Sequence, residues 1–504
     1  MRHTRAGRLV TAGLTVLFLA ATSCAPLPAT GPRLATGDDP RSNGGTGTDG
    51  SGPPERPEWL APESEPEWVN CGDRGISGIP DTVTARCGLA GQSPSIRLSS
   101  TATPDDAAPL VVVAGPETPA SELAPRLVSS GTELVDSRPL VVVDHRGRTD
   151  AAGACLTVAA RRTLDGLAAA GADPGSPELR GELADASQSC TDELQGRELD
   201  YGAVGAAQDL EVLRQHWDVP GLAILGIGAG AQTALAYSST HPDRLSLLAL
   251  DSPAPDDGDQ EGTARAALAG SDAALRLWAS SCTRPECGPG DADQKVEAVS
   301  AALDRAQEPL ADIPAALLSD VVRSALGDLS GASAPEPSGG DIILGDLIAA
   351  GPGETPESVR GRAETLSRSS LPYVAGCSDL SQRVPVSRVD ELEAEWADTP
   401  PFGEILAAQL SACSTWPVPA PMPLQVPPTV PVLLLAGIAD PVAGAAYLEP
   451  TAGRLTAAGA TEVRTVSWGA PGSAVMLHSG CAREAVTTFL DDPAAAEKST
   501  ACPS

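Results

Sequence analysis

The stretch from Leu222 to Asp251 constrains the fold of this chain more than any other. It begins with a short apolar run, Leu222–Leu225, which a glycine-rich turn, Gly226–Gly230, follows directly. A helix-forming segment then leads to a second apolar run of strand length, Leu245–Leu250. This order of apolar runs and turn residues is typical of a strand, a tight turn, a helix and a second strand. The stretch therefore predicts one βαβ unit with a sharp turn after its first strand.

The turn reads Gly226-Ile227-Gly228-Ala229-Gly230, which is the G-x-S-x-G pattern of a nucleophile elbow with glycine at its centre. In that motif the central serine has a strained backbone that lifts its hydroxyl above the sheet. A residue other than glycine in such a conformation costs about 1–3 kcal/mol, and glycine adopts it with little strain. We expect the turn to fold without its serine, but Gly228 cannot form an acyl-enzyme.

A dinucleotide-binding turn is a second interpretation of the same glycines. Gly226, Gly228 and Ala231 fit the spacing G-x-G-x-x-G/A, and Asp251 ends the next strand as a ribose-binding acid would. Two apolar runs already precede this unit, whereas the dinucleotide fingerprint usually opens its domain. An export signal also places the chain where such cofactors are scarce. We therefore favour the elbow and expect no cofactor.

The export signal occupies residues 1–24. Three arginines precede a mostly apolar run, Leu9–Ala21, and small residues precede Cys24. Cleavage before Cys24 makes a lipoprotein, with Ala21 where leucine is usual, and ordinary cleavage near Ala25 is the alternative. Either product is exported, as a lipoprotein on the outer face of the cytoplasmic membrane or as a secreted protein.

Composition limits the partners of the mature chain. Residues 25–66 are rich in Pro, Gly, Ser, Thr and Asp without an apolar period, so we expect a disordered linker. The net charge of −32 argues against nucleic-acid binding, which needs clustered Lys and Arg. No later stretch approaches the ~20 apolar residues of a membrane span, so a lipid anchor is the expected membrane contact.

Eleven cysteines occur, and setting Cys24 aside leaves an even number, which in an exported chain indicates disulfides. The chain has no CxxC pair and only five histidines, so we expect no metal site. Neighbours along the chain suggest the pairing, although sequence alone leaves the connectivity open. The suggested pairs are Cys71–Cys87, Cys155–Cys190, Cys282–Cys287, Cys377–Cys413 and Cys481–Cys502.

Other apolar runs extend the βαβ unit into a larger sheet. Runs such as Leu110–Ala114 and Val432–Leu435 are typical of strands buried on both faces of a parallel sheet. Helical segments such as Ala203–Trp217 alternate with them, which predicts a mostly parallel, doubly wound α/β core. Residues 253–428 are helical and rich in loops and proline, so we interpret them as an inserted cap. The predicted core comprises residues 67–252 and 429–504.

Several segments between residues 68 and 504 together resemble exported α/β-hydrolases of the tripeptidyl aminopeptidase and proline iminopeptidase family, peptidase family S33. None is decisive alone, but their order along the chain is specific. The resemblance implies an α/β-hydrolase fold, supports the suggested disulfides, and implies a peptide-shaped cleft under the cap. The segments are Asp144-His145-Arg146-Gly147, Asp209–Trp217, His241–Asp251, Cys282 with Cys287, Cys377-Ser378-Asp379, Cys413 with Trp416-Pro417, Gly437–Pro441, and Cys481 with Cys502.

The resemblance also assigns the catalytic positions. Asp440 is the acid of a G-x-x-D-P segment, Gly228 stands at the nucleophile, and Pro471 stands at the histidine. The oxyanion hole would use the amides of Gly115 and Ala229. One of the three catalytic side chains is therefore present.

Two further residues affect this interpretation. Glu117 follows Gly115 and brings a negative charge towards a site meant for an oxyanion. His478 is the histidine nearest to Pro471 in sequence, and a shifted loop could bring it to Asp440. We predict a non-catalytic pseudo-hydrolase that binds a peptide or an envelope protein or ligand in the cap cleft. The alternative is an active peptidase or esterase in which Asp440 and His478 act on a bound water.

Overall fold

The computed structural model describes residues 55–63, 67–71, 76–255, 259–331, 334–351, 353–445 and 447–504. The predicted export signal, Cys24 and most of the predicted linker lie outside the described residues. Residues from Pro54 to Ser504 form one compact unit. None of the helices in the described ranges has the length and hydropathy of a membrane-spanning segment.

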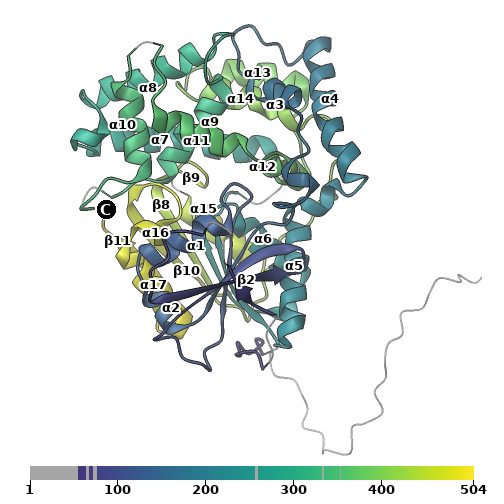
Figure 1. Cartoon of the computed structure of the whole chain (residues 1–504), viewed down its shortest axis with the longest axis vertical. Coiled ribbons are helices and arrows are strands. Elements are labelled where there is room, and N and C mark those ends of the chain that lie inside the picture. Colours follow the sequence, from purple (N-terminus) through teal and green to yellow (C-terminus); the bar gives the residue numbers. More distant parts are fainter. Residues whose placement is uncertain are drawn as a thin grey trace, which may run out of the picture. The chain divides into compact units, whose positions relative to one another are not determined.

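A mostly parallel sheet forms the core (Figure 1). Its strands lie in the order β1-β2-β3-β5-β4-β6-β7-β8-β10-β11, and β9 pairs with β8. The strands from β5 to β11 in this order are parallel, whereas β1, β2 and β3 join antiparallel. The strands are β1 (Val69–Asn70), β2 (Val83–Ala90), β3 (Ser93–Ser100), β4 (Leu110–Val113), β5 (Leu140–Val143), β6 (Leu222–Ile227), β7 (Leu245–Asp251), β8 (Val432–Asp440), β9 (Gly444–Ala445), β10 (Val463–Pro471) and β11 (Ser499–Cys502).

Continuous apolar sequence explains the central strands. Every residue of β4, β5, β6 and β7 is buried, as expected for strands covered by helices on both faces. β8 and β10 continue beyond their apolar runs to Asp440 and Pro471. This extension places both residues at one edge of the sheet, because the two strands are parallel and Pro471 pairs with Ala439.

Helices cover both faces of the sheet, and each face has its own apolar core. Leu210, Leu213 and Trp217 lie on one face of α5, and all three are buried against the strands. One face of the sheet is covered by α1 (Ala120–Ser129), α2 (Glu133–Ser137), α16 (Val475–His478) and α17 (Gly480–Asp491), and the other by α5 (Ala203–Trp217), α6 (Gly230–Thr240), with η3 (Pro242–Arg244) after it, and α15 (Leu448–Ala457).

Most of the remaining helices gather above one edge of the sheet as a cap (Figure 1). The cap has its own apolar core, in which Trp278, Leu303 and Phe402 are buried. Its helices after β7 are α7 (Gln260–Ser281), η4 (Pro285–Cys287), α8 (Ala292–Ala306), α9 (Ala315–Gly327), α10 (Gly339–Ala349), α11 (Glu357–Ser367), α12 (Leu371–Asp379), α13 (Val386–Trp396), α14 (Gly403–Gln409) and η5 (Leu410–Cys413).

A second segment joins the cap from before the elbow. Residues 151–194, within the first part of the predicted core, form η1 (Ala151–Gly153), α3 (Val158–Asp165) and α4 (Pro177–Leu194), and η2 (Glu198–Tyr201) leads back to α5. Leu156 and Leu194 pack with Leu371 and Trp416 of the later cap segments. Two segments far apart in the sequence therefore build the roof over the sheet edge.

The strand order identifies the fold. Without the short strands β1, β9 and β11, the remaining eight lie in chain order 1-2-4-3-5-6-7-8, with the sharp turn after the fifth. A mostly parallel sheet of this order, with helices on both faces and an inserted cap, is the α/β-hydrolase fold. The ten cysteines after Cys24 form disulfides in the five neighbouring pairs, Cys71–Cys87, Cys155–Cys190, Cys282–Cys287, Cys377–Cys413 and Cys481–Cys502.

Candidate functional site

The elbow between β6 and α6 keeps its backbone geometry. Gly228 has φ +55°, in the left-handed region, and its N–H donates to the carbonyl of Asp251 at 2.8 Å. A Cβ on Gly226 would lie 2.5 Å from Cα of Ala231, and one on Gly230 would lie 2.1 Å from the carbonyl oxygen of Val113. The outer glycines are therefore required for strand and helix to approach.

The centre of the same turn is different. A Cβ on Gly228 would have no atom within 4 Å, and Gly228 borders a cavity under the cap. The turn is thus shaped to present a side chain to this cavity, and it presents none. An acyl-enzyme at this position needs a nucleophile that the chain does not supply.

The loop after β4 lies against the elbow, as an oxyanion hole requires. A Cβ on Gly115 would lie 3.0 Å from Cβ of Ala229, so the two predicted oxyanion residues are adjacent. Arg148 holds this loop from behind: its guanidinium donates to the carbonyl of Pro116 at 2.9 Å and pairs with Asp144 at 2.6 Å. The two positions remain adjacent in this fold.

Glu117 changes the charge of this loop. Its Oε2 atom lies 3.0 Å from the place of a Cβ on Gly115, so its carboxylate folds back over the oxyanion loop. Glu117 lines the cavity under the cap. Its side chain is exposed to the space of that cavity. Burial raises the pKa of Glu117, and the charge of Asp320 adds to this against that of Arg148.

Asp440 lies at the end of β8 and is fully buried. Its Oδ1 atom accepts hydrogen bonds from the amides of Val442 at 2.7 Å and Ala443 at 2.9 Å, and from the hydroxyl of Ser473 at 2.8 Å. Among the described residues, none forms a hydrogen bond with Oδ2. Burial raises the pKa of this carboxyl against these donors. The hydroxyl of Ser252 also lies close enough to lower the pKa of Asp440.

Pro471 ends β10 beside this carboxyl and has no side-chain base. The next residue, Gly472, donates its N–H to the carbonyl of Ala439 at 2.9 Å, which fixes the start of the loop. Ser473 then contacts Asp440 and also borders the cavity. The sequence interpretation did not single out Ser473, because its contact depends on the packing of two strand ends.

Asp251 is a second buried acid beside the same loop. Its carboxylate accepts from the amides of Val475 at 2.8 Å and Met476 at 2.9 Å. Burial raises its pKa to about 7, and the charge of Asp440 adds to this effect against the two amides. Asp251 thus fixes the loop that follows β10, and its buried carboxylate is not placed to hold a ribose.

His478 lies at the end of α16 and is not among the residues that border the cavity. Its ring stacks on Trp468 with centroids 5.8 Å apart, and its Nε2 lies 3.6 Å from Oδ1 of Asp328. Burial lowers the pKa of His478 to about 4. These neighbours give its ring a packing role, and its action together with Asp440 stays a prediction.

The cavity beside Gly228 has a volume of about 660 Å³. This is within the range of small-molecule sites, about 300–1,000 Å³. The loops at the sheet edge form its floor, and helices of the cap form its roof. The charged residues around it are Glu117, Glu122, Asp165, Asp320, Asp328, Arg126, Arg161, Arg323 and Arg362.

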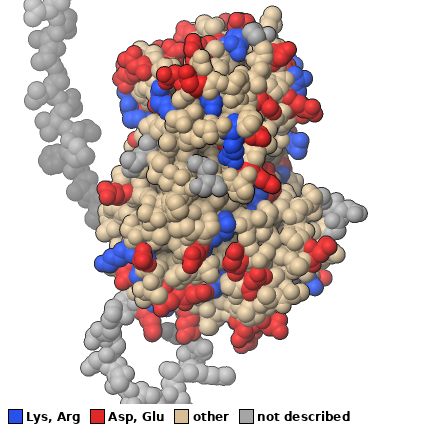
Figure 2. Space-filling model, turned by 90° about the vertical axis from the view of Figure 1, so that its left-hand side faces the viewer, with Lys and Arg blue, Asp and Glu red and all other residues tan. Residues whose placement is uncertain are grey.

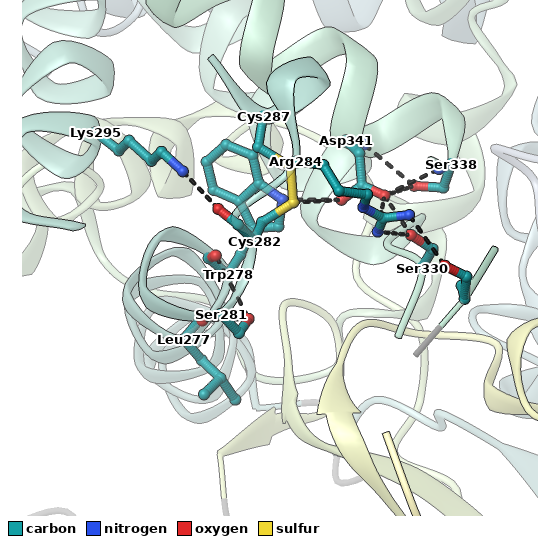
Figure 3. The surroundings of a disulfide bond; sticks show 11 residues. Leu277, Trp278, Ser281, Cys282, Arg284, Cys287, Lys295, Ser330, Ser338 and Asp341 are labelled. Carbon is teal, nitrogen blue, oxygen red and sulfur yellow. Dashed lines mark hydrogen bonds and ion pairs between the residues drawn. A yellow bond between two sulfur atoms is a disulfide. The ribbon is translucent and has the colours of Figure 1, made fainter. Parts of the chain in front are cut away.

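One group in the cap combines possible metal ligands, Cys282, Cys287 and Asp341 (Figure 3). The two sulfurs are bonded to each other and are not thiolate ligands. Asp341 accepts from Nε1 of Trp278 at 2.9 Å and lies 3.5 Å from the guanidinium of Arg284. The residues do not fit a metal centre, and we describe them as a structural anchor of the cap.

Comparisons with known proteins agree with this description. Residues 399–502 match the family model of TAP-like proteins, so the match begins in the cap, before the predicted boundary at residue 429. No curated protein matches the chain.

Solved structures with some likeness include a bromoperoxidase from Bacillus anthracis, which is 13% identical with a TM-score of 0.35 over 81% of this chain and all of that one. A 2-hydroxy-6-oxo-6-phenylhexa-2,4-dienoate hydrolase from Rhodococcus sp. strain RHA1 is 13% identical with a TM-score of 0.34. The match covers 81% of this chain and 97% of the hydrolase. An epoxide hydrolase from an endophytic Streptomyces is 12% identical with a TM-score of 0.34. The match covers 84% of this chain and all of the epoxide hydrolase. The strand order shows that the chain has the α/β-hydrolase fold, and its residues 399–502 are similar to TAP-like proteins.

Proposed function

We propose that this protein is a pseudo-hydrolase, which binds a ligand in the cavity under the cap and does not hydrolyse it. The observation that carries the proposal is the elbow, where Gly228 has the backbone conformation of a nucleophile, open space at Cβ and no side chain. Pro471 and the hydrogen bond from Ser473 to Asp440 support it from the opposite side of the site. The resemblance to tripeptidyl aminopeptidases makes a peptide, or an envelope protein or ligand, the partner to test.

A fluorophosphonate probe tests the proposal directly, because it labels an activated serine covalently. We expect the natural chain to show neither label nor turnover of peptide and p-nitrophenyl ester substrates. Gly228→Ser combined with Pro471→His restores a nucleophile and a base, and we expect label or turnover to appear. Gly361→Ser is the matched control, since a Cβ there also has open space but lies in α11 of the cap. Labelling or turnover by the purified natural chain would contradict the proposal.

We also propose that the mature protein is attached to the outer face of the cytoplasmic membrane through a lipid on Cys24. The support is the sequence pattern that precedes this cysteine. Cys24→Ala then releases the protein from the membrane fraction into the medium, which fractionation of cells measures. Equal distribution of both forms would contradict the anchor and leave the pseudo-hydrolase proposal unchanged.

A further inference from the structure

The oxyanion loop carries an unusual charge for its place in the fold. Hydrolases of this fold stabilise negative charge beside the elbow with backbone N–H groups. Here the carboxylate of Glu117 folds back over that loop, close to Gly115, and the side chain of a nucleophile is absent from Gly228. The cavity floor therefore carries a negative charge of its own, where the fold otherwise offers N–H groups that bind one.

Two other carboxyl groups at the cavity also have raised pKa values. Asp165 of α3 and Asp320 of α9 both border it. Burial raises the pKa of Asp165 to about 6, and burial also raises the pKa of Asp320. The charge of Asp320 adds to the raised pKa values of both Asp165 and Glu117. Asp320 thus repels both Glu117 and Asp165 in a partly dehydrated space.

Two of the four arginines around the cavity lie within 3.5 Å of an acid, and Arg161 of α3 lies near Asp165, whose pKa its charge lowers. Arg126 pairs with Asp328, and Arg323 lies 3.5 Å from Asp320. Arg362 donates to the hydroxyl of Ser324 at 2.8 Å. The charges of Arg148 and Arg323 lower the pKa of Glu117 against its burial, and the charge of Arg161 does the same for Asp165. Five carboxyl groups and four arginines border the cavity, so its lining carries one more acid than base.

Apolar residues complete the lining. Leu123, Leu164, Leu317 and Ile343 border the same space as the carboxyl groups. A ligand that fits this combination has an apolar body and one positively charged end. Acidic side chains are also spread over the cap end and the opposite end of the face in Figure 2, with a mostly uncharged band between them. The net charge of −32 favours the approach of a cation over that of an anion.

We infer that the cavity binds an organic cation, with its alkylammonium or guanidinium group beside Glu117 in the space left open at Gly228. The inference rests on the proposed function, since it names the class of ligand held in the same cavity. Glu117 supplies a charge-assisted hydrogen bond, and Asp165 adds attraction at longer range. A nucleophile side chain on residue 228 would occupy part of this space.

Calorimetric titration of the natural chain with benzylamine, benzyl alcohol and benzoate tests the inference, because these probes share an apolar ring and differ in charge. We expect benzylamine to bind about tenfold or more tightly than benzyl alcohol, and benzoate to bind most weakly. In Glu117→Gln the preference for benzylamine falls by about tenfold. Glu449→Gln, on the exposed surface of α15, is the matched control and keeps the preference.

The pH dependence of binding in the natural chain gives a second readout that needs no variant. Carboxyl groups with raised pKa values gain protons as the pH falls from 7.5 to 5, and Asp165 does so near 6. Benzylamine stays protonated over this range, so its affinity falls with the charge of the cavity. The affinity of benzyl alcohol stays constant.

Two results would overturn the inference. One is equal or weaker binding of benzylamine than of benzyl alcohol or benzoate, and the other is the absence of binding by all three probes. Neither result bears on the fluorophosphonate experiment, which tests the loss of catalysis. Conversely, preferred binding of benzylamine by a chain that also hydrolyses esters would sustain the inference and refute the pseudo-hydrolase proposal.

Discussion

The elbow and the acid site meet at the same edge of the sheet but differ in what they retain. The elbow keeps its backbone, with Gly228 at φ +55°, and has no side chain at its centre. The acid site has the side chain of Asp440, and Pro471, which stands at the position predicted for a histidine, has no side-chain base. Asp440 accepts from the amides of Val442 and Ala443, so the carboxylate also holds the turn after β8. A buried acid thus stands where the fold uses its hydrogen bonds, and glycine stands at a turn whose backbone it adopts without strain.

The outer glycines of the elbow test the first half of this comparison, and there we expect the largest effect. Gly230→Ala places a Cβ 2.1 Å from the carbonyl oxygen of Val113, in the central strand β4. Backbone on both sides must move, so we expect a loss of about 3 kcal/mol or more in the free energy of unfolding. Urea unfolding followed by circular dichroism measures it. A loss below about 1 kcal/mol would show that helix and strand separate easily.

The acid site provides the second test, through the pH dependence of stability. The pKa of Asp251 is about 7 in the folded protein, raised from 3.8, and the pKa of Asp440 is raised as well. Between pH 4 and 7 the folded state therefore binds more protons than the unfolded state. The stabilisation that the folded state gains from protonating these two carboxyl groups is complete below their pKa in the unfolded chain. It is lost as the pH rises through their raised pKa values in the folded protein.

Asp440→Asn isolates that contribution. The amide cannot ionise, and Asp251 loses the neighbouring charge that raises its pKa. Between pH 4 and 7 we expect the free energy of unfolding of the natural chain to fall relative to that of the variant, by about 1.4 kcal/mol for each unit of pKa shift removed. Urea unfolding at each pH measures it. Asp492→Asn, on an exposed carboxyl after α17, is the control and keeps the natural slope. Identical slopes for Asp440→Asn and the natural chain would show that the two buried acids do not interact.

The sequence predicts much of this arrangement, and the limits have a physical cause. The position of Gly228 follows from a local turn pattern, and that of Asp440 from the resemblance, which matches a G-x-x-D-P segment. Each pattern lies within one short stretch of the sequence. The hydrogen bond from Ser473 to Asp440 joins residues 33 apart, and that from Val475 to Asp251 joins residues 224 apart. Such contacts depend on the register of neighbouring strands, which apolar runs do not determine.

The same reasoning applies to the cap. The helices after β7 follow from their apolar period, but residues 151–194 join the same layer by packing Leu156 and Leu194 against residues more than 170 positions away, such as Leu371. The proximity of Asp165 to Asp320, on which the charge of the cavity depends, arises from this packing. The candidate ligand site was therefore only partly predictable, because its floor is local in sequence and its roof is not.

The centre of the elbow offers the last test, with the smallest expected effect. Gly228→Ala adds a Cβ that meets no atom within 4 Å, so its cost comes from backbone strain at φ +55° alone. A left-handed conformation costs an L-residue about 1–2 kcal/mol, and the lower entropy of the unfolded chain returns about 0.4–1 kcal/mol of this. We expect a net loss near 1 kcal/mol by urea unfolding, well below that of Gly230→Ala. An equal loss at both positions would mean that the central glycine is required by the fold, and its presence would then say nothing about a lost nucleophile.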